Sequence, residues 1–243
     1  TSSVAYSNRK YNYSRDTNSE NELGFSKFDV PHRLMAQLSY TTPKYLNGWT
    51  STTISVIYNG FSGSRYSLTM NEVSDFNGDG QKGNSLLYIP TEAEMDNMNF
   101  VDYTDQKTGK LIMSAADSRK AFTEWVNNDD YAKNHRGQYA ERNSNLSNWE
   151  HEIDLHLAQT IYNAQGLGKL EFTFDIINFA NMLNKKWGAS YSSAYNLSPL
   201  TVVSLSTDEN GNRNPGYAFN NAKINKSDIS SRWHAQVGIR LTF

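Results

Sequence analysis

The sequence of 243 residues contains no cysteine, no long hydrophobic run and no marked excess of charge of either sign. The absence of cysteine excludes a disulfide framework and thiol catalysis, and it is compatible with any cellular compartment. No segment approaches the roughly 18 consecutive apolar residues of a transmembrane helix, so the sequence excludes a helical membrane protein. A net charge of −2 gives no electrostatic reason to expect binding to nucleic acid.

Apolar residues are scarce as well: they make up 37 % of the chain, against roughly 45–50 % in an average globular domain. A membrane β-barrel tolerates this scarcity, because half of its strand residues face a wet lumen and its outer loops are polar. The 15 Tyr, 11 Phe and 5 Trp suit the aromatic girdles of such a barrel, although β-sandwiches are rich in Tyr too. The sequence starts at Thr1 without an initiator Met or a signal peptide, so we expect a mature or partial chain.

The end of the chain, Ser231 to Phe243, carries the strongest pattern. Odd positions from Trp233 onward are all apolar and even positions are polar or glycine, which predicts a strand with one apolar face. An antiparallel strand on a soluble core gives the same alternation. The apolar face runs to an aromatic last residue, however, whereas the terminus of a soluble protein usually frays into water. The pattern favours a lipid-facing barrel strand, with a soluble β-sandwich as the alternative.

Similar alternation occurs in four other segments and, more weakly, in residues 1–13. These segments are 28–40, 49–61, 149–161 and a stretch that begins at Lys169. Short turns are expected at Asn47-Gly48 and Gln165-Gly166. Residues 14–27, 67–147 and 181–230 are long polar excursions, and within them helices are expected at about 91–98 and 114–126.

Short and long connections alternate strictly, as they do in outer-membrane barrels, where periplasmic turns are short and external loops are long. This places both short turns and Phe243 on the periplasmic side. About six strands cannot close a transmembrane barrel, whose minimum is 8, and an open sheet leaves backbone groups unpaired in lipid. We therefore expect an all-β, antiparallel transmembrane β-barrel segment of about six strands within a larger barrel, its last strand pairing with a strand absent from this sequence.

Several stretches carry a resemblance to a known family. They are F-D-V-P-H-R-L (28–34), D-F-N-G-D-G with S-L-L-Y-I-P (75–80 and 85–90), R-N-S-N-L-S-N-W-E-H-E-I-D-L (142–155), F-D-I-I-N-F-A-N-M-L-N (174–184) and the terminal R-L-T-F. On these stretches the chain resembles the C-terminal part of a TonB-dependent outer-membrane receptor, of the Oar-like (OmpA-related) branch common in Bacteroidetes. One departure from that branch is Asn148, where a proline is expected before the tryptophan.

The resemblance implies a barrel of about 22 strands with a plugged lumen, in the outer membrane of a Gram-negative cell. Its function would be TonB-dependent uptake of a nutrient such as a peptide, a glycan or another large solute. The implied partners are outer-membrane lipid, the TonB system through a plug absent from this sequence, a surface lipoprotein, and the barrel-assembly machinery, which would recognise Phe243. The alternatives are a secreted or cell-surface β-rich binding module, or a barrel that serves protein export or anchoring.

No enzymatic activity is expected, since no G-x-S-x-G or S-x-x-K context supports a serine nucleophile. The five histidines are scattered, and the one close pair, His151 and His156, lies on opposite faces of a strand, so zinc is not expected. Six other polar residues fall on predicted lumen faces. They are Glu150, Glu152, Asp154, His156, Glu171 and Asp175. We interpret them as solvated charges that pair with Lys or Arg of the plug, substrate contact being the alternative.

No cofactor is required, but the D-F-N-G-D-G stretch matches the first half of a calcium loop. Asp75, Asn77 and Asp79 stand at positions 1, 3 and 5, Gly80 at the turn, and the Gln81 carbonyl at position 7. Position 12 is a leucine instead of the usual bidentate glutamate. Calcium binding and a metal-free turn rich in Asn, Asp and Gly are both left open.

Aromatic residues in the two longest excursions are candidate stacking surfaces for a substrate or a partner lipoprotein. They are Trp125, Tyr131, Tyr139, Trp187, Tyr191 and Tyr195. The alternative is that they form small hydrophobic cores within the loops.

Overall fold

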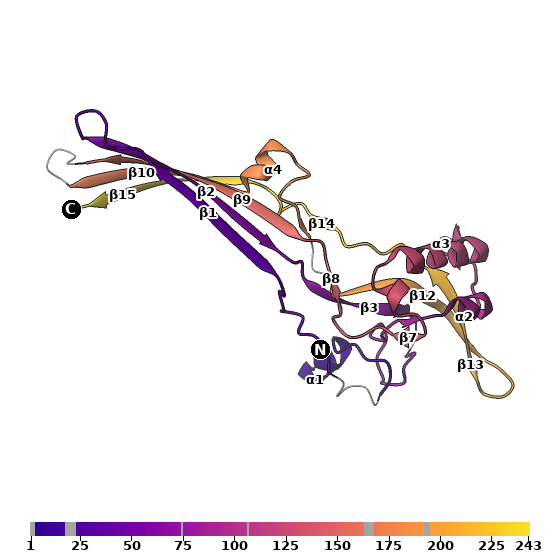
Figure 1. Ribbon diagram of the computed structural model, residues 1–243. Helices are drawn as coiled ribbons and strands as arrows, with labels where there is room; N and C mark the ends of the chain where they lie inside the picture. The colour runs from indigo at the N-terminus through magenta and orange to yellow at the C-terminus, as the bar shows by residue number, and fades with distance from the viewer. Residues whose placement is uncertain (1–2, 18–22, 74, 106, 163–167, 192–194) are drawn as a thin grey trace. The chain divides into compact units, whose positions relative to one another are not determined.

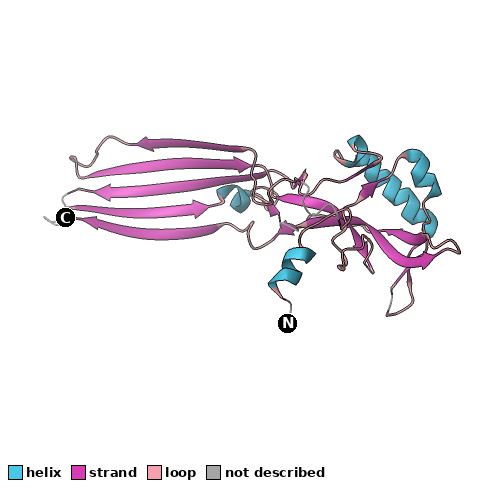
Figure 2. Ribbon diagram, turned by 90° about the horizontal axis from the view of Figure 1, so that it is seen from below, coloured by secondary structure: helices cyan, strands magenta, loops and turns pink. Residues whose placement is uncertain are grey.

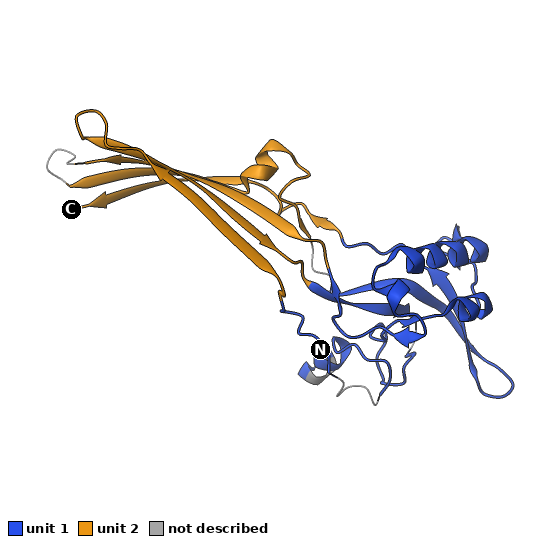
Figure 3. Ribbon diagram, viewed as in Figure 1, with its two compact units in different colours: residues 1–29, 65–146, 193–224 blue, residues 30–64, 147–192, 225–243 orange. Residues whose placement is uncertain are grey.

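The computed structural model describes residues 3–17, 23–73, 75–105, 107–162, 168–191 and 195–243 (Figure 1). Most of its regular structure is β, in sheets whose strands pair mainly antiparallel, and no closed barrel occurs among these residues (Figure 2). The chain divides into two compact units (Figure 3). Unit 1 comprises residues 1–29, 65–146 and 193–224, and unit 2 comprises residues 30–64, 147–192 and 225–243.

Unit 2 is built on a five-stranded antiparallel sheet of order β1-β2-β9-β10-β15. Its strands are β1 Arg33–Thr41, β2 Thr50–Phe61, β9 Glu150–Ile161, β10 Lys169–Ile177 and β15 His234–Thr242. All five correspond to segments with period-two alternation, so these five strand predictions are confirmed. The first and last strands, β1 and β15, are the two edges of the sheet.

The register brings the apolar positions of all five strands onto one face. Leu38 is paired with Val56, and Ile54 with Leu157. Phe174 is paired with both Leu157 and Val237. Because neighbouring residues in a strand point to opposite faces, a slip of one residue in any pairing would mix the two faces. No such slip occurs, so the sheet has one apolar and one polar face.

Both short connections lie at the same end of this sheet as Phe243. Thr50 is paired with Ile161, and Lys169 with Thr242. The predicted turn at Asn47-Gly48 is confirmed, since Leu46, Asn47 and Gly48 have positive φ angles between paired Tyr45 and Thr50. The turn predicted at Gln165-Gly166 lies outside the described residues.

The other end of the sheet is organised by two asparagines of the F-D-I-I-N-F-A-N stretch. Asn178 has a left-handed backbone (φ 54°) and is buried; its N–H donates to Asp154 Oδ1 (2.8 Å) and its amide to the carbonyls of Gly188 and Ser231. Asn181 donates to the carbonyl of Trp187 (2.8 Å). Together they hold the short helix α4 Phe179–Leu183 and the ribbon of β11 Ser190–Tyr191 with β14 Lys226–Ser227.

The strand predicted over residues 1–13 is wrong: this segment forms the helix α1 Val4–Lys10. Its alternation was weak, and Val4 is exposed. A helix satisfies most backbone groups internally, without a partner strand, and its last turn carries Arg9 and Lys10, which suit a helix C-terminus. Among the described residues, five of the about six strands expected from alternation are therefore present.

Unit 1 contains a four-stranded sheet of order β13-β12-β3-β8, which the sequence did not reveal. The strands are β3 Arg65–Glu72, β8 Asn145–Leu146, β12 Asn196–Thr207 and β13 Arg213–Phe219. Two smaller ribbons pair β4 Tyr88–Ile89 with β7 Gln138–Tyr139, and β5 Tyr103–Thr104 with β6 Leu111–Met113. Strands β12 and β3 run parallel, with Leu197 beside Leu68. The two longest polar excursions thus meet in one sheet.

Both helices predicted within the first of these excursions are confirmed. Helix α2 Glu92–Asn97 starts at a capping box, in which Thr91 and Glu94 bind each other's backbone N–H groups. Helix α3 Ala115–Asn128 starts at Ser114, whose hydroxyl accepts from Asp117 N (3.1 Å), and a short 3-10 helix, η1 Ala132–Asn134, follows it. No helix among the described residues is long and apolar enough to cross a membrane.

These helices and strands enclose a hydrophobic core of their own. Phe122 and Val126 of α3 pack with Leu68 of β3 and with Leu87 and Ile89, and all five are fully buried. Burying such side chains contributes roughly 1.5–3 kcal/mol each. Unit 1 therefore has the core of a folded domain.

We predict that Leu68→Ala destabilises unit 1 by about 2–5 kcal/mol, because it removes a fully buried side chain and leaves a cavity. Leu111→Ala is the matched control, since Leu111 is exposed and its loss is expected to change stability by less than about 0.5 kcal/mol. Denaturant unfolding followed by tryptophan fluorescence measures both changes. Equal effects of the two substitutions would contradict the assigned core.

Candidate functional site

The most unusual surface in the described residues is the apolar face of the five-stranded sheet, called the apolar face below. Its apolar residues are Leu34, Ala36, Leu38, Tyr40, Ile54, Val56, Tyr58, Ile153, Leu155, Leu157, Ile161, Leu170, Phe172, Phe174, Ile176, Ala235, Val237, Ile239 and Leu241. Thr50, Thr52 and Gln159 lie on the same face near the turns. The side chains of Leu38, Val237 and Ile239 are 76 %, 73 % and 69 % exposed. Every residue of β1 is exposed. A sheet in water normally covers its apolar face with another layer.

Burial is inverted across the sheet. In β2, Ser55 on the polar face is only 5 % exposed, whereas its neighbours Ile54 and Val56 on the apolar face are 44 % and 40 % exposed. Ser51 and Thr160 are also buried on the polar face. At these positions of β2 the polar side chains are thus the sheltered ones and the apolar side chains the exposed ones, whereas Ile176 of β10 is buried on the apolar face. This arrangement is the reverse of a soluble core, and it leaves a contiguous apolar patch of the kind that marks an interaction surface.

The strands are staggered in one direction across the sheet. In β1, Leu34 to Tyr40 lie level with Gly60 to Ile54 of β2. In β15, Ala235 to Leu241 are level, through β10 and β9, with Val56 to Thr50 of the same strand. The apolar stretch is therefore displaced by four residues over four strand spacings, or about 13 Å over about 19 Å.

This stagger corresponds to a strand tilt of about 35°, at the lower edge of the range of about 35–45° in transmembrane barrels. A strand of nine residues, such as β1 or β15, is about 30 Å long and at this tilt rises about 25 Å. The apolar band of an outer-membrane barrel is about 25 Å tall. Strand length and stagger thus fit one apolar layer.

Aromatic side chains gather at both ends of the apolar face. Near the turns, Tyr40, Tyr45, Trp49 and Phe243 are all exposed. At the opposite end a ladder of stacked rings crosses three chain segments: His32, Trp149, His151 and Tyr58, with neighbouring centroids 6.1–6.3 Å apart. The Tyr58 hydroxyl lies 2.8 Å from His151 Nδ1. Such rings suit a boundary at which one side is apolar and the other is wet.

A cavity of about 370 Å³ adjoins this ladder within unit 2. Trp149, His151, Trp187 and Tyr191 contribute rings to its lining, and Lys186 adds a positive charge. Of the predicted loop aromatics, Trp187 and Tyr191 therefore belong here. The sequence does not predict this ladder, because His32, Tyr58 and the Trp149–His151 segment are far apart in the chain.

The polar residues predicted to face the lumen all lie on the polar face, and several already have partners. His156 contacts Asp175 across the β9–β10 pair. Glu171 lies 3.2 Å from Lys169 and 3.5 Å from Arg240. These partners come from the sheet itself, so the His156–Asp175 pair and the cluster around Glu171 are formed without a residue of the plug.

The other three predicted lumen-facing residues, Glu150, Glu152 and Asp154, lie toward the end of the sheet opposite the short turns. Asp154 accepts the N–H of Asn178, and Glu150 accepts the N–H of Tyr191 (3.0 Å). Glu152 lies between them on the same face, level with Asn59. Two of the three carboxylates thus position the segment that follows β10.

The other predicted loop aromatics are in unit 1 and do not converge. Trp125 stacks on Phe122 against the core (6.0 Å, 8°), and Tyr131 stacks on His135 (3.9 Å) while its hydroxyl accepts Glu141 N. Tyr139 and Tyr195 are exposed and line two different cavities. Core formation, the alternative interpretation, therefore describes Trp125 and Tyr131.

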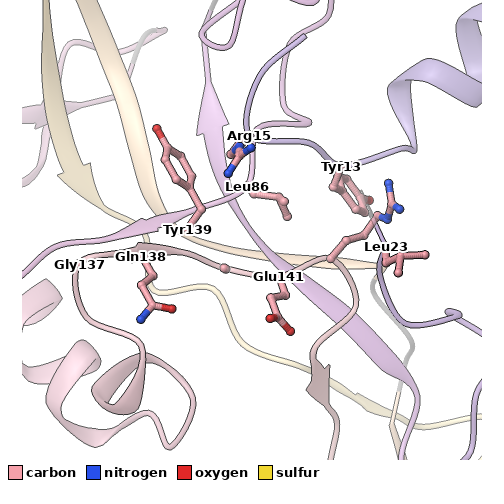
Figure 4. Close-up of a pocket in the computed structure, with 10 residues that line it drawn as sticks. Tyr13, Arg15, Leu23, Leu86, Gly137, Gln138, Tyr139 and Glu141 are labelled. Carbon is pink, nitrogen blue, oxygen red and sulfur yellow. The ribbon is translucent and has the colours of Figure 1, made fainter. Parts of the chain in front are cut away.

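The cavity beside Tyr139 measures about 410 Å³ and is mixed in chemistry (Figure 4). Arg15, Glu141 and Arg142 line it together with Tyr13 and Tyr139. Burial raises the pKa of Tyr13 to about 12, so its hydroxyl stays protonated at neutral pH and can donate a hydrogen bond. The cavity is suited to a polar ligand with acceptor groups.

In the predicted calcium loop, the first two candidate side chains bind the loop's own backbone. Asp75 accepts from Gly78 N (2.8 Å) and Gly80 N (3.0 Å), and Asn77 accepts from Asp79 N (3.2 Å). Gln81 donates its N–H to Asp79 Oδ1 (2.8 Å). No three His, Cys, Asp or Glu side chains of the described residues converge in the geometry of a metal site.

Comparisons with protein-family models, with curated proteins and with solved structures found no match for this chain.

We predict that the chain associates in detergent-free buffer and binds a hydrophobic dye such as anilinonaphthalene sulfonate, because its apolar face is uncovered. Replacing Leu38, Val237 and Ile239 together with serine is expected to reduce both dye fluorescence and particle size. The matched triple Gln37→Ser, Gln236→Ser and Thr242→Ser alters neighbouring positions on the polar face and leaves both unchanged. A monomeric wild type without dye binding would contradict the exposure of this face.

Proposed function

We propose that the five-stranded sheet spans the outer membrane of a Gram-negative cell as part of a larger β-barrel that takes up a large solute in a TonB-dependent manner. The observation that supports this most strongly is the burial along β2 and the exposure of the edge strands: Ser51 and Ser55 are buried while Ile54 and Val56 are exposed, and Leu38, Val237 and Ile239 are exposed as well. Lipid tails are the surroundings in which such a face is stable.

Three further features support the membrane assignment. The tilt and length of the strands fit an apolar layer of about 25 Å. Aromatic side chains lie at both ends of the apolar face, where girdles are expected. The two short connections and Phe243 share one end, while the chain leaves the sheet for unit 1 from the other. In an outer-membrane barrel these ends would be the periplasmic and the external side.

The two sheet edges argue for further strands. In lipid, each unpaired N–H or C=O group of an edge costs several kcal/mol, and both β1 and β15 are nine residues long. A closed barrel needs at least 8 strands. We therefore propose that strands from outside this sequence pair with both edges, and that Phe243 takes part in recognition by the barrel-assembly machinery, as in the family that the sequence resembles.

Uptake driven by TonB is the part of the proposal that rests on the sequence resemblance. The structure contributes a place for recognition, because unit 1 has its own core and a cavity of about 410 Å³ with charged and tyrosine side chains. The same unit is the observation that favours the alternative function, a β-rich binding module at the cell surface. A binding module in water, however, would have to cover the apolar face with a partner protein.

The membrane assignment predicts that Val237→Arg prevents stable insertion, because a cation near the middle of the lipid-facing band costs about 2–4 kcal/mol. Gln236→Arg is the control, since this neighbour lies on the opposite face of the same strand. The fraction of each variant recovered folded in the outer membrane of the producing cell is the measurement. Equal recovery of the two variants would rule out a lipid-facing β15.

A further inference from the structure

Unit 1 buries two carboxylates close together at the end of β3. Glu72 is 7 % exposed and Asp79 is 4 % exposed. Burial raises the pKa of Glu72; the Ser85 hydroxyl and the Gly83 N–H lower it, and the negative charges of Asp79 and Asp75 raise it, with a net upward shift. Within the described part of the chain, neither Glu72 nor Asp79 forms a salt bridge with a lysine or an arginine. Two buried like charges without a cation are costly.

The hydrogen bonds around these carboxylates leave oxygen atoms unused. Glu72 Oε2 accepts from Gly83 N (2.9 Å), whereas the buried Oε1 and the neighbouring buried Ser85 hydroxyl make no hydrogen bond of normal geometry among the described residues. Asn84 is fully buried and donates through Nδ2 to Asp79 Oδ2, which leaves its Oδ1 buried and without a partner too. A buried polar atom without a partner costs about 1–3 kcal/mol.

We propose that Glu72, Asp79 and Asn84 form a binding site for a calcium ion, called the Glu72 site below. Calcium takes six to eight oxygen ligands from carboxylates, amide oxygens, carbonyls and water. Two carboxylates supply the compensating charge, and a half-turn of the Asn84 amide presents its oxygen instead of its nitrogen. An ion at this place would balance the charge of the two carboxylates and give Glu72 Oε1 a ligand bond.

The Glu72 site differs from the loop expected from the sequence. Asp75 and Asn77 shape the turn by accepting backbone N–H groups, and Gly78, Gly80 and Gly83 have the positive φ angles that the turn requires. The charge that position 12 of the motif lacks comes from Glu72, which precedes the motif. Sequence spacing alone does not show this contribution.

An ion at this place would fix the loop that joins β3 to the buried Leu86 and Leu87. The same loop holds the N-terminal segment, because Ser14 N donates to the Asn84 carbonyl (3.1 Å) and Leu86 N to the Ser14 carbonyl (2.9 Å). Calcium would therefore stabilise unit 1 and the attachment of residues 12–17. This role is independent of the membrane proposal.

Isothermal titration of the calcium-depleted full chain in detergent micelles with CaCl₂ tests the Glu72 site. We expect one ion per chain and a rise in unfolding temperature. Glu72→Gln is expected to weaken binding at least about tenfold, because it removes one of two charges from a hard-cation site. Asp208→Asn is the control: Asp208 is an exposed aspartate that also accepts backbone N–H groups, from Asn210 and Asn212.

A variant with higher calcium affinity distinguishes a true binding site from a loss of binding caused by misfolding. Asn84→Asp adds a carboxylate at the same place and is expected to tighten calcium binding several-fold, with circular dichroism unchanged in the presence of calcium. The proposal is overturned if the wild type binds no calcium at about 10 mM, above the weakest range of extracellular calcium modules. It is equally overturned if Glu72→Gln binds as the wild type does.

Discussion

The structure depends on one constraint: an antiparallel sheet with an apolar face must place that face, and both of its hydrogen-bonding edges, in suitable surroundings. In the five-stranded sheet the register is kept over all four pairings, so the alternating apolar positions of the strands reach the same side, with exceptions such as Met35 and Ile57. No described element shelters Leu38 or Val237, whereas Ser55 on the opposite side is buried. Lipid on one side and polar contents on the other satisfy this arrangement.

Unit 1 buries its apolar residues in a core of its own instead of exposing them on one face. Its strands β3 and β12 lie beside each other in parallel and are buried on both faces along most of their common length. A helix with a buried Phe122 packs on them. Such a unit needs no lipid, and its cavities and its cluster of buried carboxylates are where recognition and ion binding are proposed. The chain thus combines a sheet suited to a membrane with a domain that has an ordinary hydrophobic core.

The sequence predicts those elements whose environment has a simple period. The five long strands have one face in each of two surroundings, so their alternation is strict. The two predicted helices begin at Thr91 and Ser114, whose capping chemistry is local. Strands β3 and β12 were missed because burial on both faces removes the alternation. The strand predicted over residues 1–13 is wrong because a short segment with a few scattered tyrosines carries too little periodicity to distinguish a helix from a strand.

For the candidate sites, the limit of prediction is tertiary contact. The alternation of apolar and polar residues is enough to predict that Glu150, Glu171 and His156 lie on the polar face. It could not show that Trp125 stacks on Phe122 or that His32, Trp149 and His151 form one ladder. The role proposed for Glu72 depends on its burial beside Asp79, which no spacing rule encodes.

The central claim is that β15 has lipid on one side and water on the other. Because the chain has no cysteine, single cysteines can be placed at each position from His234 to Thr242 and reacted with a membrane-impermeant maleimide in detergent micelles or lipid bilayers. The account predicts alternating reactivity: fast labelling at His234, Gln236, Arg240 and Thr242, and protection at Ala235, Val237, Ile239 and Leu241. Equal labelling along both faces, or protection of the polar positions, would contradict it.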